Sequence, residues 1–109
     1  MEIQVRRVRQ MSSGGSFVAI YEAEVEFSEV DLSVKVEILR VHPTDANERS
    51  VAETREAIRL GAERVLRPRG LGALIRVHRV VVHPADFSPV QYQMLTSEKL
   101  LEVLPQHSG

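Results

Sequence analysis

The pattern Val-His-Pro-x-Asp occurs twice in the sequence, at residues 41–45 and 82–86. Histidine and aspartate bind metal ions and also transfer protons near neutral pH. If the strands before the two motifs are parallel neighbours, both turns lie at the same edge of a sheet. A metal or acid–base site there would use His42, Asp45, His83 and Asp86. The simpler interpretation needs no ligand, because proline ends a strand and aspartate caps a following helix.

Two further segments contain residues that suit phosphate binding. Ser13, Gly14 and Gly15 form a glycine turn, and Arg67 and Arg69 lie in a basic loop that could contact a nucleic-acid backbone. The turn lacks the lysine and the following helix of a P-loop, and a hairpin turn also explains its glycines. Arginine at a helix end also interacts favourably with the helix dipole. Contact of these five residues with RNA or a partner is therefore one hypothesis, and a structural role is the other.

Composition excludes several classes of protein. The chain has 109 residues and no cysteine, which fits one domain over 1–109 and excludes disulfides, thiolate metal sites and cysteine nucleophiles. A hydrophobic fraction of 43% and a charged fraction of 27% are typical of a soluble globular protein. The sequence shows no signal peptide, membrane-spanning run or nucleophile elbow. We therefore expect a cytoplasmic protein without a cofactor, and binding rather than catalysis.

Charge is divided between two opposite blocks, although the formal net charge is −1. Residues 22–37 contain six acids and one lysine, and residues 55–79 contain seven arginines and two glutamates. This division excludes a uniformly basic binder but permits a basic surface. Such a surface would use Arg6, Arg7, Arg9, Arg67 and Arg69. Alternatively, a second copy of the chain could place its arginines against the acidic strand face formed by Glu22, Glu24 and Glu26.

Alternation of apolar and polar residues predicts four strands. The strands are expected at residues 3–9, 17–27, 32–41 and 73–83. In the second strand the odd positions from Phe17 to Phe27 are apolar and face the core, and we expect the second and third strands to form a hairpin. The fourth strand is apolar on both sides, which is typical of a central strand.

Two helices complete the predicted fold. Asp45 is the expected cap of a helix over residues 46–66, and Ser88 with Pro89 begins a second helix, which we expect to break at Thr96–Ser97. The apolar positions of the second helix are Val90, Met94, Leu100, Leu101 and Leu104. The order β-β-β-α-β-α predicts an α+β two-layer sandwich with a four-stranded mixed sheet. The predicted sheet contains one parallel pair, which the long helix connects.

Three segments resemble the fourth domain of translation elongation factor G. Residues 13–15, followed by Phe17, are similar to the glycine-rich hairpin turn of that domain. Residues 57–61, Ala-Ile-Arg-Leu-Gly, are similar to its helix segment. Residues 70–72, Gly-Leu-Gly, and the strand 75–80 are similar to the turn and strand that follow that helix. The resemblance covers about residues 3–95.

The resemblance implies a left-handed β-α-β crossover, whereas such crossovers are right-handed in nearly all proteins. It also implies a binding module that contacts RNA or the ribosome through loop tips, here Ser13, Gly14, Gly15 and the loop from His83 to Pro89. The chain has no P-loop, so we expect no GTP hydrolysis. The alternatives are an oligomeric interaction protein and a small metal or acid–base enzyme that uses the two His-Pro turns.

Overall fold

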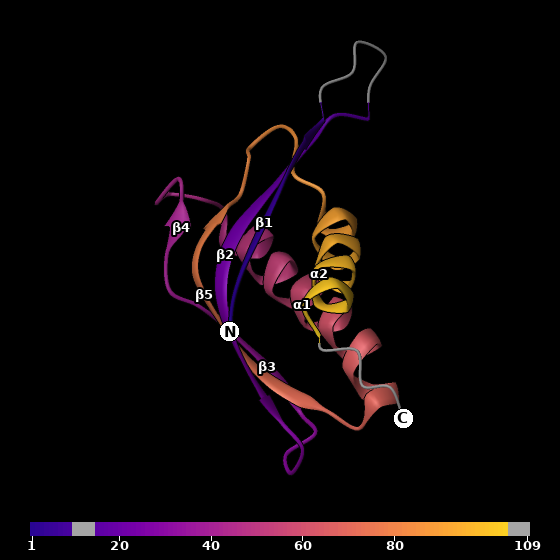
Figure 1. Cartoon of the computed structure of the whole chain (residues 1–109). Coiled ribbons are helices and arrows are strands. Elements are labelled where there is room, and N and C mark those ends of the chain that lie inside the picture. Colours follow the sequence, from indigo (N-terminus) through magenta and orange to yellow (C-terminus); the bar gives the residue numbers. More distant parts are fainter. Residues whose placement is uncertain (10–14, 105–109) are drawn as a thin grey trace.

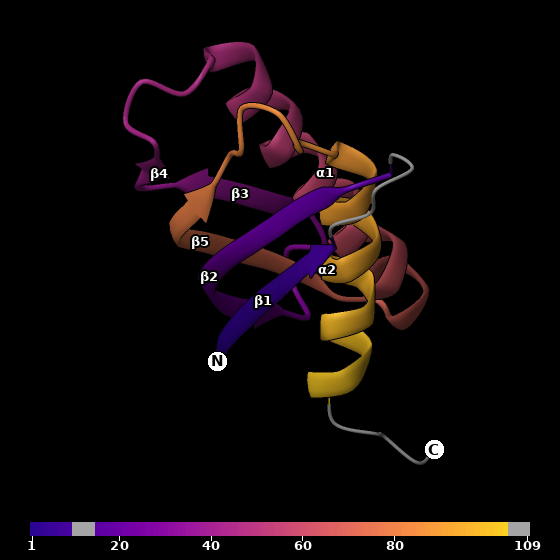
Figure 2. The ribbon, with the colours of Figure 1, turned by 90° about the horizontal axis from the view of Figure 1, so that it is seen from above.

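Seven regular elements form two layers in the computed structural model, which describes residues 1–9 and 15–104. The strands are β1 (Glu2–Arg9), β2 (Phe17–Ser28), β3 (Val34–Ile38), β4 (Val41–His42) and β5 (Gly72–Val81). The helices are α1 (Glu48–Leu66) and α2 (Pro89–Val103), and the short 3-10 turn η1 (Arg67–Arg69) follows α1. Both helices cover the same face of the sheet (Figures 1 and 2). The α+β class is as predicted, and the two-residue β4 is an addition to the four expected strands.

The strand order differs from the expected hairpin of the second and third strands. The sheet has the order β1-β2-β5-β3, and β4 also pairs with β5. β2 therefore pairs with β1 and β5, both antiparallel, and β3 and β4 lie parallel to β5. The predicted parallel pair joined by the long helix is thus confirmed, as is the central position of the fourth predicted strand. The predicted pairing of the second and third strands is wrong.

Gly72 allows the chain to pass from β2 to β3 around the start of β5. A Cβ atom at residue 72 would lie 2.1 Å from the Asp31 carbonyl oxygen and 2.6 Å from that of Ser33. The Ser33 carbonyl instead accepts a hydrogen bond from the Ala73 amide at 3.0 Å. Because the loop lies so close to the backbone of β5, a side chain at residue 72 would displace it.

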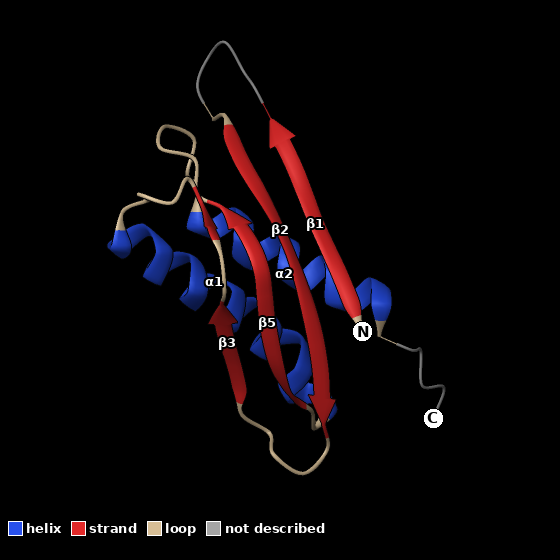
Figure 3. Ribbon diagram, turned by 90° about the vertical axis from the view of Figure 1, so that its left-hand side faces the viewer, coloured by secondary structure: helices blue, strands red, loops and turns tan. Residues whose placement is uncertain are grey.

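The connection from β3 through α1 to β5 is left-handed. In Figure 3 the helices lie behind the sheet, and β3 and β5 both point upward. The chain rises along β3, descends behind the sheet in α1, and returns to rise along β5, which lies to the right of β3. A right-handed connection behind the sheet would place β5 to the left. The crossover therefore has the rare hand that the resemblance to elongation factor G implies.

A β-bulge at His78 explains the two apolar faces of β5. Glu22 pairs with Arg79 and Ala23 with Val77, so His78 has no partner in β2. The extra residue shifts the alternation of the side chains by one position. Ile75 and Val77 face the core before the bulge, and Val80 and Val82 face it afterwards. The bulge therefore brings residues of both parities into the core, which accounts for a strand that is apolar on both sides.

The apolar positions of α2 differ from those expected. Tyr92, Leu95, Thr96 and Leu100 are buried, whereas Val90, Met94 and Leu101 are exposed. The helix is continuous through Thr96 and Ser97 because their hydroxyl groups donate hydrogen bonds to backbone carbonyls, Thr96 to Tyr92 and Ser97 to Gly61. Polar residues therefore lie on the buried face of this helix, where an apolar pattern cannot reveal them.

Asn47 caps α1, where Asp45 was expected. The Asn47 Oδ1 atom accepts hydrogen bonds from the amides of Arg49 and Ser50 at 2.8 and 3.4 Å. The buried stripe of α1 includes Ile58, Ala62, Val65 and Leu66. In β2, Phe17 and Tyr21 are buried as expected, and Phe27 packs against the core.

Candidate functional site

Three connections meet at one end of the sheet, which we call the hairpin end. They are the β1–β2 connection, residues 43–47 between β4 and α1, and residues 82–88 between β5 and α2 (Figure 1). The Val82 amide donates to the His42 carbonyl at 2.9 Å, and the Val18 amide donates to the Asp86 carbonyl at 3.0 Å. Both His-Pro turns therefore lie at the same edge of the sheet, as predicted.

The side chains of the two turns are not gathered into a metal site. The His83 Nδ1 atom accepts hydrogen bonds from the Ala85 and Asp86 amides at 3.1 and 2.9 Å, and the Asp86 carboxylate lies 3.9 Å from it. His42 and Asp45 are exposed. Among residues 1–9 and 15–104, no three His, Asp or Glu side chains are grouped so that they could hold a metal ion. The His83 side chain therefore stabilises its own turn, because its Nδ1 atom accepts hydrogen bonds from both amides.

The five predicted contact residues do not form one surface. Gly15 is exposed at the hairpin end, with a φ of 81°, and Ser13 and Gly14 lie outside the described residues. Arg67 and Arg69 lie beyond the C-terminal end of α1, far from the hairpin end in Figure 1. The Arg69 Nη1 atom donates to the Val65 carbonyl at 2.8 Å, and the Arg67 Nη2 atom lies 3.5 Å from the Glu63 carboxylate. These two arginines thus interact with the end of their own helix, which is the structural role considered above.

The arginines of β1 provide exposed positive charge that leads toward the hairpin end. Arg6, Arg7 and Arg9 are all exposed on this edge strand. Arg7 lies 3.5 Å from Glu98 of α2, and both side chains are more than half exposed. Arg6 and Arg9 form no ion pair with any described residue. Strand alternation places Arg7 and Arg9 on the helix side of β1 and Arg6 on the opposite side.

Part of the basic block on α1 is neutralised within the helix. The Arg59 guanidinium donates to Glu56 on one side and, at 2.7 Å, to Glu63 on the other. These contacts raise the pKa of Arg59, and the hydrogen bond from Arg59 lowers the pKa of Glu56. Arg49 similarly lies 3.5 Å from Glu53. The excess of arginine over residues 55–79 is therefore a weaker guide to a binding surface than the sequence suggested.

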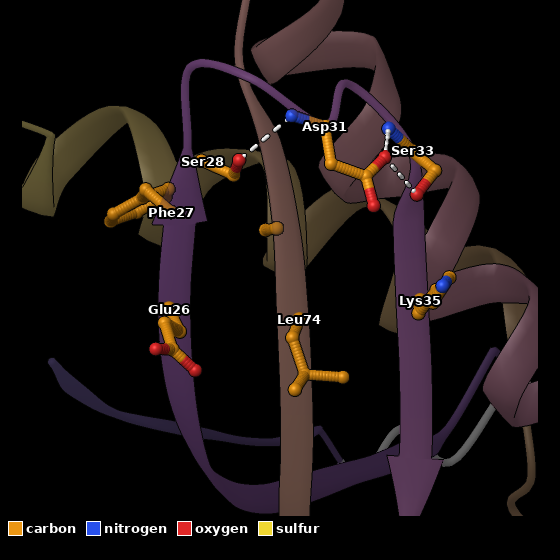
Figure 4. A pocket seen from close by; sticks show the side chains of 8 residues that line it. Glu26, Phe27, Ser28, Asp31, Ser33, Lys35 and Leu74 are labelled. Atoms are coloured by element: carbon orange, nitrogen blue, oxygen red, sulfur yellow. Dashed lines mark hydrogen bonds between the residues drawn. The ribbon is translucent and has the colours of Figure 1, made fainter.

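A shallow hollow of about 360 Å³ lies at the opposite end of the sheet from the hairpin end, beside the β2–β3 loop (Figure 4). It is lined by Glu26, Phe27, Ser28, Asp31, Ser33, Lys35, Ala73 and Leu74. The Asp31 Oδ1 atom accepts hydrogen bonds from the Ser33 amide and hydroxyl at 3.0 and 2.7 Å, which lowers the pKa of Asp31. The Ser28 hydroxyl oxygen accepts the Asp31 amide at 2.9 Å. These polar groups hold the loop, and no pattern in the sequence pointed to the hollow.

The function of this chain must be inferred from its fold and its surface, because the sequence comparisons return no relative. No protein-family model and no curated protein sequence matches this chain. Among the described residues, neither helix is long and apolar enough to cross a membrane. The strand order and the single layer of helices define the structural class as an open-faced α+β sandwich with a left-handed crossover.

Proposed function

We propose that this protein is a non-enzymatic binding module with a fold like that of the fourth domain of elongation factor G, and that it contacts RNA of the translation machinery through its hairpin end. The observation that carries the proposal is the left-handed connection from β3 through α1 to β5 (Figure 3). Few folds have this hand, because the twist of a strand favours the opposite one. The left-handed connection therefore supports the resemblance to elongation factor G, for which the sequence offers only short motifs.

The surface at the hairpin end supports the same proposal. The two His-Pro turns and the start of β2 are linked by hydrogen bonds there, and β1 brings Arg7 and Arg9 to its outer edge. The only described partner of Arg7 is the exposed carboxylate of Glu98, 3.5 Å away. A phosphate group could replace this carboxylate at little cost in free energy, because exposed ion pairs are weak. Arginine binds phosphate with two parallel hydrogen bonds, so exposed arginines on an edge strand suit a nucleic-acid backbone.

Fluorescence anisotropy with a labelled fragment of small-subunit ribosomal RNA tests the proposal. We expect binding that weakens as salt concentration rises, because phosphate contacts release counterions. The double variant Arg7→Gln/Arg9→Gln should bind more weakly at every salt concentration. Its plot of log affinity against log salt should be shallower by roughly one unit for each phosphate that the variant no longer binds.

Arg55 and Arg64 supply the matched control. Both are exposed on α1, away from β1, and form no ion pair with another described residue. The variant Arg55→Gln/Arg64→Gln changes the net charge by the same amount, and it should bind RNA with nearly the wild-type affinity and salt dependence. Absence of RNA binding at low salt, or equal losses in the two double variants, would contradict the proposal.

A further inference from the structure

The face of the sheet opposite the helices, which we call the open face, is covered by no described element (Figure 3). Alternation and register assign its central residues. On β2 they are Val18, Ile20, Glu22, Glu24 and Glu26, and on β5 they are Leu74, Arg76, Arg79 and Val81. Val8 of β1 pairs with Val18 and lies on the same face.

The part of the open face nearest the hairpin end contains four apolar residues, with Arg6 of β1 beside Ile20. Ile20 pairs with Val81, and Val8 pairs with Val18. Val8 is 45% exposed, and the other three are half-buried. Four neighbouring β-branched residues that face solvent are typical of a surface that another protein covers.

Farther from the hairpin end, the two central strands of the open face carry stripes of opposite charge. Glu22 pairs with Arg79 and Glu24 with Arg76, so acids follow β2 and arginines follow β5. No carboxylate of β2 forms an ion pair with these arginines or with any other described residue, and the one described contact of Arg76 is with Glu37 at 3.8 Å. Both stripes are therefore available to a partner that bears the same charges in exchanged positions.

The open face is complementary to itself about a twofold axis. An axis parallel to the strands and midway between β2 and β5 would place β2 of one copy over β5 of the other, as in aligned sheet packing. Ile20 would then face the partner's Val81, Glu22 the partner's Arg79, and Glu24 the partner's Arg76. Each contact would occur twice.

We propose that the open face is a docking surface for a second copy of this chain, with the apolar residues at the hairpin end of the interface and the exchanged charge stripes along the rest of β2 and β5. This dimer goes beyond the proposed RNA contact, which uses the edge of β1. The charge pattern selects this occupant, because a uniformly acidic or basic partner would face one like-charged stripe.

Sedimentation velocity over a concentration series tests the dimer with charge-reversal variants. Wild-type protein should shift from monomer to dimer as concentration rises. Glu22→Arg and Arg79→Glu should each remain monomeric, because each places like charges opposite one another twice. An equimolar mixture of the two variants should form heterodimers, since the new cation at position 22 of one chain then faces the new carboxylate at position 79 of the other. Circular dichroism checks that both variants are folded.

Matched controls separate this geometry from general attraction between oppositely charged proteins. Glu102→Arg and Arg64→Glu change net charge by the same amounts at exposed helix positions. Each control should dimerise like wild type, and mixing the two controls should not increase the fraction of dimer. The neutral variant Ile20→Gln should lose the dimer, because a polar amide would replace an apolar contact at the hairpin end of the interface. Wild-type protein that stays monomeric throughout, single variants that dimerise like wild type, or a reversal mixture that stays monomeric would each overturn the proposal.

Discussion

Tyr21 and Thr96 form the buried polar contact between β2 and α2. Their hydroxyl oxygens are 2.7 Å apart, and both residues are at most 1% exposed. Thr96 donates its own proton to the Tyr92 carbonyl, so the Tyr21 hydroxyl is the donor in this pair. The rings of Tyr21 and Tyr92 also stack, with centroids 6.3 Å apart. These contacts fix the orientation of α2 on the sheet, and with it the loop at the hairpin end.

We expect Thr96→Val to destabilise the fold by about 1–3 kcal/mol, because it leaves the Tyr21 hydroxyl buried without a partner. Urea denaturation monitored by circular dichroism measures this loss. The double variant Tyr21→Phe/Thr96→Val removes both hydroxyl groups and should be more stable than Thr96→Val alone. Equal stability of these two variants would show that the buried hydroxyl group of Tyr21 carries no penalty.

Burial of two tyrosines predicts a loss of stability in alkali. Burial raises the pKa of Tyr92 from 10.0 to about 12, and burial also raises the pKa of Tyr21. In the folded protein both stay neutral at a pH where the unfolded chain has already lost these protons. Stability is therefore complete below pH 10 and falls as pH rises above it. Melting temperatures between pH 8 and 12 should show this fall, and Tyr92→Phe should reduce its slope.

At the scale of elements, Gly61 sets the distance between α1 and α2. A Cβ atom at this position would lie 2.3 Å from the Gln93 carbonyl oxygen. The Ser97 hydroxyl donates to the Gly61 carbonyl at 2.7 Å, so α2 lies directly against the backbone of α1. Gly61 thus has a packing role, and it holds together the two helices that cover the sheet.

Gly61→Ala should cost about 1–3 kcal/mol, because overpacking must move one helix backbone, although alanine is the better helix former. Gly70→Ala is the control. Gly70 has a φ of 65° and no heavy atom within 4 Å of an added Cβ atom, so its replacement adds backbone strain of about 1–2 kcal/mol without a clash. The displaced helix should also lower the cooperativity of thermal unfolding in Gly61→Ala, and Gly70→Ala should not show this effect. A Gly61→Ala variant as stable as wild type would show that the two helices can separate without cost.

At the scale of the whole molecule, the proposed dimer and the proposed RNA contact are geometrically compatible. A twofold axis parallel to the strands keeps the strand direction, so the hairpin ends of both copies point the same way. The dimer would therefore present two sets of β1 arginines to one RNA, and binding of the second set would gain from its high effective concentration.

The monomeric variant Ile20→Gln should consequently bind RNA more weakly than wild type, with a shallower salt dependence, although no arginine is changed. Fluorescence anisotropy at protein concentrations above and below the dimer midpoint makes the comparison. The two proteins should agree below the midpoint, where both are monomers. A difference that persists there would show that Ile20→Gln alters the RNA contact itself.

The sequence by itself determined the four longer strands, the two helices and the face of β2 that lies in the core. It also placed both His-Pro turns at one edge of the sheet. Periods of 2 and 3.6 report the buried face of an element, and this information is local. The same periodicity failed at the bulge of His78 and on the polar buried face of α2. The bulge arises where β5 pairs with β2, and Thr96 of α2 is paired with Tyr21. Both partners come from distant parts of the chain.

Only the tertiary structure decided the strand order, the hand of the crossover and the separation of the arginine groups. Alternation shows which way a side chain points but does not show which strand lies beside it. β5 lies between β2 and β3, and the loop before β3 passes close to Gly72, a long-range contact that no local pattern encodes. The pairing of β2 with β5 sets Glu22 beside Arg79 and Glu24 beside Arg76, and so it turns two separate charge blocks of the sequence into adjacent stripes on one face.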